Sequence, residues 1–292
     1  MRVATVDIGS NSFILLIVDS GITGVRKIHE EFRTVALASG KISQKKIETA
    51  KKTIADFRDI CKGYNVEQTF PFGTEAMRNL SKNKELIHLL EGALGEKLNI
   101  IPGRKEAELS FIGTTYNKNI KSTETVMTID VGGGSTEVAY GAGKTVRECF
   151  SIPIGAWKVK QEGSSILDEY LPAVTKNKEK IEHLFAVGGN ITSAAGVFLG
   201  LDEYIEEMID GTRMYLADIE QIEKRFLALP RDRLEKLLPF DRERIDILPF
   251  GLAIYRKILK AVGRSPEPYC IVSTRGVRWG YILRMLGLIR GD

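Results

Sequence analysis

The stretch that decides the fold runs from Val126 to Tyr140 and reads VMTIDVGGGSTEVAY. Val126, Thr128 and Ile129 are β-branched, which is typical of a buried strand, and an apolar strand resumes after Glu137. The glycines between the two strands tolerate positive φ and carry no large side chain. The backbone can therefore curl there so that several N–H groups converge on one anion. The segment predicts a strand, a tight turn and a second strand.

Two carboxylates bracket this turn. Asp130 stands where the first strand ends, and Glu137 stands where the second begins. Backbone donors flanked by carboxylates suit a phosphate that carries a divalent cation. Taken alone, the motif has a second interpretation, a glycine-rich hairpin whose acids are simply solvated.

The N-terminus repeats the layout. Residues 3–19 read VATVDIGSNSFILLIVD, so a β-rich strand ends at Asp7, a short turn of Gly, Ser and Asn follows, and an apolar strand resumes. Two such hairpins in separate parts of the chain predict two similar lobes, each contributing a phosphate-binding turn to one cleft. This pairing resembles the actin-like phosphotransferase superfamily, which includes sugar kinases and heat-shock chaperones.

The bulk composition is that of an ordinary globular protein. The chain has 292 residues, of which 43% are hydrophobic and 27% charged, and this length allows two domains with a core each. No apolar run approaches the roughly 18 residues of a membrane-spanning helix, and Met1 leads directly into a strand without a signal region. We therefore expect a cytoplasmic protein without a membrane partner. The net charge of +4 is too mild for a dedicated nucleic-acid binder.

The cysteines and histidines are scattered. Cys61, Cys149 and Cys270 have no metal-type spacing, and the three histidines stand apart from one another. Neither a zinc site nor a serine triad is indicated.

The rest of the chain predicts strands that alternate with helices, which favours parallel pairing in an α/β fold. Helices are expected over residues 43–62, 84–94, about 165–183 and 218–261 (broken at Pro230 and Pro239), from Gly103 onward, and after Gly276. Further strands are expected over residues 25–37, 66–72, 98–101, 150–156, 184–187 and 269–273. The polar segment 117–124 predicts a hinge. It divides the chain into a first domain of about 1–120 plus the C-terminal helix 276–292, and a second domain of 121–275.

Six segments, in this order, resemble the exopolyphosphatase/guanosine pentaphosphate phosphohydrolase (Ppx/GppA) family of the actin-like superfamily. They are Asp7–Ser12, Gly73–Arg78, Gly103–Ala107, Asp130–Glu137, Gly188–Asn190 and Val272–Gly280. The resemblance covers essentially the whole chain. It implies an α/β fold of two actin-like (ribonuclease H-like) lobes with an interlobe cleft.

The same resemblance supports roles for single residues. Glu106 is the candidate general base, and Asp7, Asp130 and Glu137 are candidate ligands of Mg²⁺ (or Mn²⁺), because hard cations prefer oxygen ligands. The candidate phosphate-binding residues supply backbone or side-chain donors. They are Ser10, Asn11, Ser12, Arg78, Gly132, Gly133, Gly134, Ser135, Thr136, Gly188, Gly189 and Asn190.

Three of these assignments have alternatives or departures. By periodicity alone, Glu106 is a surface acid of a helix, and Arg78 pairs with Glu75 three residues earlier. Lys105 stands where the family often has an acid, and Asn190 where it usually has Thr. Long members of the family carry a C-terminal helical HD-type domain, which this chain lacks. We therefore expect cleavage of short polyphosphates in a distributive manner.

The leading hypothesis is a Mg²⁺-dependent phosphohydrolase that releases terminal phosphate from inorganic polyphosphate, with the water activated by Glu106. The alternative is the same chemistry on guanosine pentaphosphate (pppGpp) or on a nucleoside triphosphate. A small-molecule kinase of the superfamily and a nucleotide-gated binding module are the other two classes. The sequence leaves open the main substrate, the preferred chain length, the metal and the oligomeric state, with a homodimer among the options.

Overall fold

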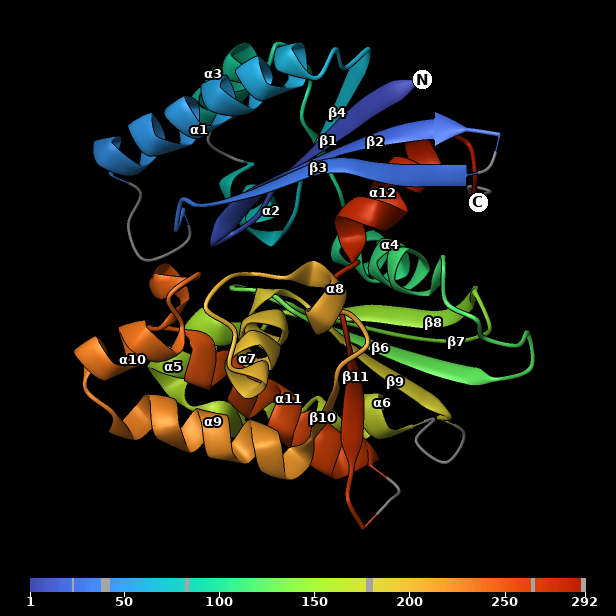
Figure 1. Cartoon of the computed structure of the whole chain (residues 1–292), viewed down its shortest axis with the longest axis vertical. Coiled ribbons are helices and arrows are strands. Elements are labelled where there is room, and N and C mark those ends of the chain that lie inside the picture. Colours follow the sequence, from blue (N-terminus) through green and yellow to red (C-terminus); the bar gives the residue numbers. More distant parts are fainter. Residues whose placement is uncertain (23, 38–42, 82–83, 177–180, 264–265, 290–292) are drawn as a thin grey trace. The chain divides into compact units, whose positions relative to one another are not determined.

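Two β-sheets organise the protein, whose computed structural model describes residues 1–22, 24–37, 43–81, 84–176, 181–263 and 266–289. One sheet has five strands in the order β3-β2-β1-β4-β5, and the other has six in the order β10-β11-β9-β6-β7-β8 (Figure 1). The chain divides into two compact units, which are Met1–Glu106 with Arg278–Asp292, and Ala107–Val277. Each unit holds one sheet.

The division falls at residues 106 and 277, where the sequence suggested about 120 and 275. It lies inside the helix α4 (Gly103–Thr115) rather than in the polar segment that follows this helix. The reason is packing, because Phe111 of α4 is fully buried against Val126, Ala139 and Phe185 of the second sheet. The later turns of α4 therefore belong to the second unit.

The first sheet begins as an antiparallel meander and continues with parallel strands. Its strands are β1 (Arg2–Ile8), β2 (Ser12–Gly21), β3 (Gly24–Thr34), β4 (Gln68–Gly73) and β5 (Asn99–Ile100). β1 pairs with β2 in antiparallel and with β4 in parallel orientation, β2 pairs with β3 in antiparallel orientation, and β4 pairs with β5 in parallel orientation. The predicted N-terminal hairpin is confirmed.

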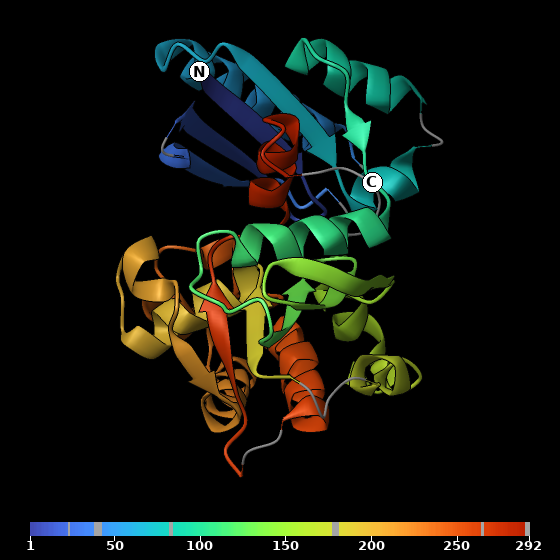
Figure 2. The same ribbon diagram turned by 90° about the vertical axis from the view of Figure 1, so that its right-hand side faces the viewer.

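Helices cover both faces of this sheet. On one face, Val6 and Ile8 of β1 share a core with α1 (Gln44–Gly63) and α3 (Lys84–Leu94). On the other face, Phe72 lies 4.3 Å, ring centroid to ring centroid, from Tyr281 of α12 (Val277–Met285), which Figure 2 shows in red before the strands. The short helix α2 (Glu75–Leu80) follows β4 directly. The carboxyl ends of β1, β4 and β5 meet at one edge of the sheet.

The second sheet repeats this plan. Its strands are β6 (Thr125–Val131), β7 (Thr136–Ala142), β8 (Thr145–Ile152), β9 (His183–Val187), β10 (Arg213–Tyr215) and β11 (Tyr269–Ser273). β6 pairs with β7 in antiparallel and with β9 in parallel orientation, and β11 pairs with β9 in parallel orientation. The order β8-β7-β6-β9-β11 therefore matches β3-β2-β1-β4-β5, and the predicted α/β fold of two similar lobes is confirmed.

One face of the second sheet carries α4, and the other carries most of the remaining helices. α7 (Gly189–Leu199), α9 (Leu216–Ala228) and α11 (Leu248–Val262) share the core on that other face with Met127, Ile129 and Val131 of β6. The shorter helices are α5 (Ala156–Glu162), α6 (Leu171–Thr175), α8 (Glu206–Ile209) and α10 (Arg231–Leu237), with 3₁₀ turns η1 (Ser164–Leu167) and η3 (Arg242–Arg244).

The predicted helix over about 165–183 is wrong. The structure has α5 before it, a positive φ of 83° at Gly163, the turn η1, the short α6 and then β9 from His183. Pro172 lacks an N–H and lies in the first turn of α6, so a longer helix could not run through this position. Residues 177–180 of the prediction lie outside the described part of the chain.

Most of the other predicted elements are present. Ser43 caps α1 by accepting from Lys46 N at 3.4 Å, as its position before the helix predicts. The strand and loop predicted over 150–156 correspond to the end of β8, which runs from Thr145 to Ile152, and to the residues that lead into α5. No sequence signal marked the three-residue edge strand β10. Among the described helices, none has the length and apolar character that crossing a membrane requires.

Candidate active site

The same turn is built once in each unit. Between β6 and β7, Gly132 N donates to Ser135 O at 2.9 Å, and between β1 and β2, Gly9 N donates to Ser12 O at 3.1 Å. Asp130 precedes its turn glycine by two residues, and Asp7 does the same in the first unit. Both acids therefore stand at the carboxyl end of a central strand, where ligands bind in open α/β sheets.

The two turns differ in the residue opposite this acid. Asp130 pairs across the strands with Glu137, whereas Asp7 pairs with Ile14. Cross-strand partners lie on the same face of a sheet, and like charges placed directly opposite each other destabilise it. A divalent cation held by the two carboxylates would offset this repulsion.

The chemistry of this pair fits Mg²⁺. Within the described ranges no group of three His, Cys, Asp or Glu side chains is gathered at a metal-binding spacing. Mg²⁺, however, is usually held by one or two carboxylates together with water and substrate phosphate. Asp130 is partly exposed, whereas Glu137 is 3% exposed and accepts from Ser151 Oγ at 2.7 Å. Asp7, 7% exposed, belongs to the first unit.

The turn between β6 and β7 presents its N–H groups on one side, because its carbonyl oxygens accept hydrogen bonds from the first residues of α5. Ala156 N donates to Gly132 O at 3.1 Å, and Trp157 N donates to Gly133 O at 3.0 Å. In a trans peptide the N–H points opposite to the C=O, so the N–H groups of Gly133 and Gly134 point away from α5. Both glycines are partly exposed. The sequence predicted phosphate donors in this turn, and these two N–H groups are the candidates for that role.

Several of the predicted side-chain donors serve internal bonds. Thr136, fully buried, donates through Oγ1 to Ile154 O at 2.7 Å, and Ser10 donates through Oγ to Glu75 Oε2 at 2.8 Å. Asn11 Nδ2 donates to Ser12 Oγ at 3.2 Å, and Ser135 is 3% exposed. In this structure these side chains fix the shape of the turns.

A third glycine turn adjoins the second hairpin. Gly188 follows β9 with a φ of 104°, and a Cβ there would lie 2.9 Å from Val131 O and 3.0 Å from Asp130 Oδ1. Only glycine fits this approach, because both the space and the backbone conformation exclude a side chain. The turn leads into α7, whose first N–H groups have no partner within the helix and favour an anion.

Tyr255 ties the strands beneath these turns. Its hydroxyl donates to Val187 O of β9 and accepts from Val131 N of β6 at 3.2 Å. Burial, and after it the charge of Asp130, raises the pKa of Tyr255 well above its usual value. The hydroxyl therefore stays protonated and keeps the carboxyl ends of the two strands together.

Asn190 is buried rather than presented to a ligand. It is 1% exposed, its Nδ2 donates to Val131 O at 3.3 Å, and a Cβ on Gly251 of α11 would lie 2.4 Å from its Cγ. The side chain thus joins α7 to β6 and α11. Gly189, the preceding residue and also a predicted phosphate-binding residue, is the first residue of α7.

Arg78 and Glu106 are bonded to each other in the first unit. Arg78 Nη1 lies 2.7 Å from Glu106 Oε2 and donates also to Ile101 O at 2.9 Å. Glu106 is 8% exposed, so it is not a surface acid, and Glu75 accepts from Ser10 and Asn79 instead of Arg78. This ion pair gives the Glu106 carboxylate a fixed position.

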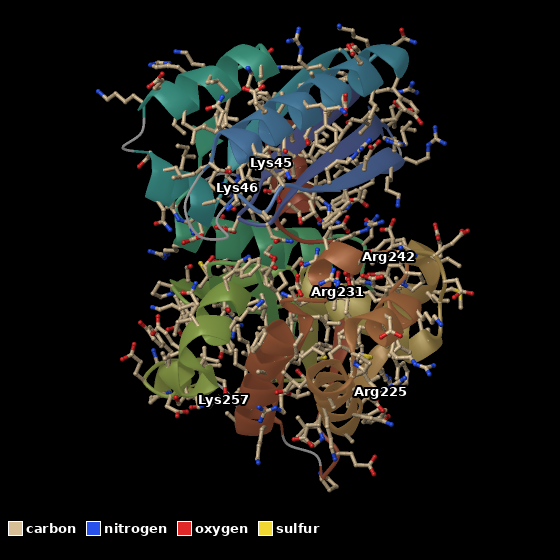
Figure 3. The ribbon with its side chains drawn as sticks, turned by 90° about the vertical axis from the view of Figure 1, so that its left-hand side faces the viewer. Lys45, Lys46, Arg225, Arg231, Arg242 and Lys257 are labelled. Atoms are coloured by element: carbon tan, nitrogen blue, oxygen red, sulfur yellow. The ribbon has the colours of Figure 1, made fainter. Side chains whose placement is uncertain are left out.

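Arg244 was not predicted. It is 5% exposed, its Nε donates to Asp241 Oδ2 at 2.5 Å, and a Cβ on Gly189 would lie 2.4 Å from its guanidinium. A positive charge is thus packed against the start of α7. The neighbouring Arg242 and Arg231 are labelled in Figure 3, and Arg231 Nη1 pairs with Asp246 Oδ1 at 2.9 Å. The sequence signal that could have pointed to Arg244 is its position shortly before the apolar helix α11.

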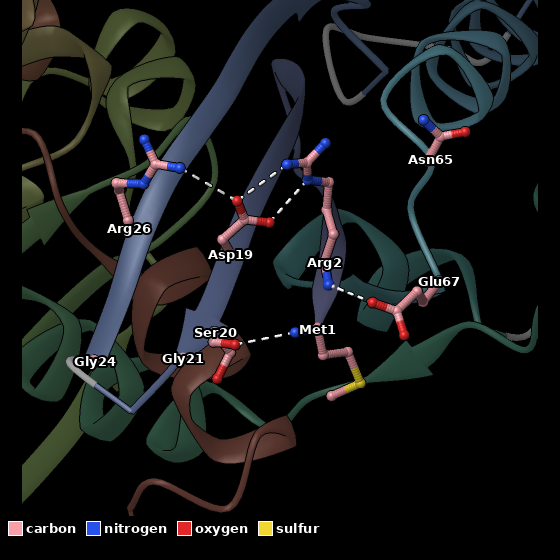
Figure 4. A pocket seen from close by; sticks show the side chains of 9 residues that line it. All are labelled: Met1, Arg2, Asp19, Ser20, Gly21, Gly24, Arg26, Asn65 and Glu67. Atoms are coloured by element: carbon pink, nitrogen blue, oxygen red, sulfur yellow. Dashed lines mark hydrogen bonds and ion pairs between the residues drawn. The ribbon is translucent and has the colours of Figure 1, made fainter.

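A pocket of about 530 Å³ lies at the other end of β1, and no predicted site residue lines it (Figure 4). In it, Arg2 Nε bonds Asp19 Oδ1 at 2.8 Å, and Arg26 approaches the other oxygen of this carboxylate at 3.4 Å. The Arg2 guanidinium lowers the pKa of Asp19 below its usual value through this hydrogen bond. Arg2 and Arg26 therefore both pair with Asp19 in this pocket.

The comparison with known families decides the assignment. Residues 16–288 match the description "Ppx/GppA phosphatase family". The chain belongs to this family. The resemblance drawn from the six sequence motifs is therefore confirmed, and with it the prediction of an enzyme of the phosphatase type.

Ppx/GppA relatives support this membership over the whole chain. "Exopolyphosphatase 2" of Mycobacterium tuberculosis is 24% identical over 98% of this chain and 99% of its own length. "Guanosine-5'-triphosphate,3'-diphosphate pyrophosphatase" of Aeromonas salmonicida is 26% identical over 89% of this chain and 55% of its own length. These two names correspond to two of the three substrates that the sequence left open, inorganic polyphosphate and guanosine pentaphosphate.

Solved structures of Ppx/GppA proteins share the fold. An exopolyphosphatase from Cytophaga hutchinsonii superimposes with a TM-score of 0.88 at 22% identity, over 99% of both chains. The Aquifex aeolicus family member gives a TM-score of 0.78 at 24% identity over 100% of this chain and 99% of the other. At such identities the likeness concerns the fold.

Proposed function

We propose that this protein is a divalent-metal-dependent phosphohydrolase that releases terminal phosphate from inorganic polyphosphate. The observation that carries the proposal is the Asp130–Glu137 pair beside the outward N–H groups of Gly133 and Gly134. Carboxylates for a cation next to donors for a phosphate are what phosphoryl transfer requires. The names of relatives in the Ppx/GppA family support the choice of a phosphoanhydride as the substrate.

Each part of the reaction has a candidate residue. Mg²⁺ (or Mn²⁺), held by Asp130 and Glu137, would neutralise the charge that develops on the phosphate oxygens. Asp7, proposed as a further metal ligand, is the matching acid at the turn of the first unit. Glu106 accepts the proton of the attacking water as the water oxygen bonds to the terminal phosphorus. The bond from that phosphorus to the bridging oxygen breaks, and this oxygen stays on the shortened chain. Arg78 holds the Glu106 carboxylate in place.

The second candidate is the same chemistry on guanosine pentaphosphate. The pyrophosphatases of Aeromonas carry that substrate in their names, and they align with 89% of this chain. The proposal includes a cytoplasmic location and no partner among nucleic acids or membranes. A small-molecule kinase is the least favoured option, because the role proposed for Glu106 is to activate a water rather than a substrate hydroxyl.

The experiment is a parallel measurement of phosphate release from short polyphosphate, long polyphosphate, guanosine pentaphosphate and ATP, with Mg²⁺ and with EDTA. We expect the highest kcat/KM on a polyphosphate and no release in EDTA. Full activity in EDTA would remove the metal from the proposal. Preference for guanosine pentaphosphate would select the second candidate, and failure to release phosphate from all four would overturn the proposed function.

A further inference from the structure

The carboxylate of Asp130 is surrounded closely on both of its oxygens. Ser110 Oγ of α4 donates to Oδ2 at 2.6 Å. A Cβ on Gly276 would lie 3.2 Å from the same oxygen, and a Cβ on Gly188 would lie 3.0 Å from Oδ1. Three segments that are distant in the sequence therefore approach one carboxylate.

The hydrogen bond of Ser110 is unusual for a residue inside a helix. Ser and Thr in helices commonly donate to a carbonyl one turn earlier, and Thr115 of the same helix does so, to Phe111 O at 2.9 Å. Ser110 is 1% exposed and turns its hydroxyl out of the helix, toward the sheet. The distance of 2.6 Å from its Oγ to Asp130 Oδ2 is that of a close hydrogen bond.

This bond fixes an angle that the carboxylate would otherwise leave free. The last side-chain torsion of an aspartate is broad, so a single donor on one oxygen selects its orientation. With Oδ2 bonded to Ser110, Oδ1 is the oxygen near Gly188, at the carboxyl end of the strands. A cation ligand is improved by such a fixed orientation, because less freedom is lost when the ion binds.

We propose that Ser110 is a positioning residue that orients Asp130 for the divalent cation. The inference rests on the proposed function only in taking Asp130 as a cation ligand. It makes α4 a carrier of two functional side chains, since Ser110 follows the candidate base Glu106 by four residues on one helix.

The test measures Mn²⁺ binding directly, by the electron paramagnetic resonance signal of free Mn²⁺, on the full chain with inorganic phosphate present. We expect Ser110→Ala to weaken Mn²⁺ binding about 10-fold or more, the usual effect of losing a residue that orients a metal ligand. Ser110→Thr, which restores the hydroxyl, should recover most of it. In the activity assay, Ser110→Ala should need more Mg²⁺ for half-maximal rate and approach normal kcat when Mg²⁺ saturates.

Thr114→Val is the matched control. Thr114 is also buried on α4 and donates out of the helix at 3.0 Å, but to Arg275 O rather than to Asp130. Its loss should leave Mn²⁺ affinity unchanged, and equal melting temperatures of the two variants would exclude a general effect of a lost buried hydroxyl. In the Asp130→Asn background, Ser110→Ala should have no further effect, because the pair acts as one unit.

The outcomes separate this inference from the proposed function. Unchanged Mn²⁺ affinity of Ser110→Ala, or loss of affinity equal to that of Thr114→Val, overturns the positioning role while phosphate release by the unmodified protein upholds the function. Absence of Mn²⁺ binding by the unmodified protein overturns the inference as well, because Asp130 is then no cation ligand. Normal metal results with no phosphate release would leave Ser110 in its role and remove the function.

Discussion

The ion pair between Arg78 and Glu106 changes how two functional residues are understood. From the sequence, one was a clamp for phosphate and the other a base for water, in separate roles. The distance of 2.7 Å between Arg78 Nη1 and Glu106 Oε2 makes them partners in the folded protein. A variant at one position therefore alters the surroundings of the other.

For the base itself we expect a large effect on turnover. Glu106→Gln keeps the size of the side chain but cannot accept a proton, and a positioned general base contributes about 10²–10⁴-fold. Turnover at saturating substrate should fall by at least the lower figure, with little change in affinity. Glu108→Gln on the same helix is the control. Near-normal turnover of Glu106→Gln would place the base elsewhere.

For Arg78 the structure predicts a mixed effect. Arg78→Ala removes the partner of Glu106 and the donor to Ile101 O, so turnover should fall together with affinity for the polyanion. Because the two side chains are in contact, Arg78→Ala should cost much less in the Glu106→Gln background than alone. Steady-state kinetics of both single variants and the double variant provide this cycle. Fully additive losses would contradict the coupling.

The sequence indicated which residues lie near the candidate site. It was a poorer guide to the atoms that their side chains contact. Thr136 and Asn190 stand beside glycine turns, but their side chains bond Ile154 O and Val131 O. Which atom a hydroxyl or an amide reaches depends on segments that approach from elsewhere in the chain, and a local motif holds no information on that. The burial of Arg244 against Gly189 depends on such an approach too.

At the scale of elements, α5 and the second hairpin depend on one glycine. A Cβ on Gly155 would lie 2.4 Å from the backbone carbon of Gly133, so any side chain must displace the turn or the helix. Gly155→Ala should lower both the melting temperature and the rate of phosphate release. Gly92→Ala is the control, because Gly92 is exposed in α3 with no neighbour near its Cβ and should stabilise by about 0.4–1 kcal/mol. An unchanged melting temperature of Gly155→Ala would show that the turn yields easily.

Elements with strong periodicity were predictable, and weakly marked ones were not. The two hairpins and the helices α1 and α3 carry β-branched runs or apolar positions at helical spacing. The segment around Pro172 has a helical composition, but the proline restricts the helix there to the five residues of α6. β10 has three residues, and its pairing with β11 alone defines it.

At the scale of the whole molecule, the strand order explains why two unlike sequences build similar units. In each, a meander of three strands is continued by a parallel strand, and an aspartate stands next to the last residue of the central strand. The sequence could predict this duplication because the turns share their spacing. It could not predict the boundary at Glu106, because that follows from where Phe111 packs.

Folding stability should depend on pH through Asp19. Its pKa is lowered in the folded state by the hydrogen bond from Arg2, so the unfolded state binds protons first as the pH falls. The stabilisation is present above the unfolded carboxyl's pKa of about 3.9 and is lost as the pH falls through the lower folded value. Urea unfolding of Asp19→Asn should therefore show a lower midpoint than the unmodified protein at pH 7 and an equal one in strong acid. A difference that persists in strong acid would assign the effect to packing.

The docking of α5 on the glycine turn also has a consequence for discrimination between ions. The carbonyl oxygens of Gly132 and Gly133 are already used by the first N–H groups of that helix. A bare cation meets carbonyl oxygens that each already accept a hydrogen bond, whereas an anion meets the N–H hydrogens of these two peptides. The turn therefore favours an anion, and a cation bound beside it would be held by carboxylates rather than by these two peptides.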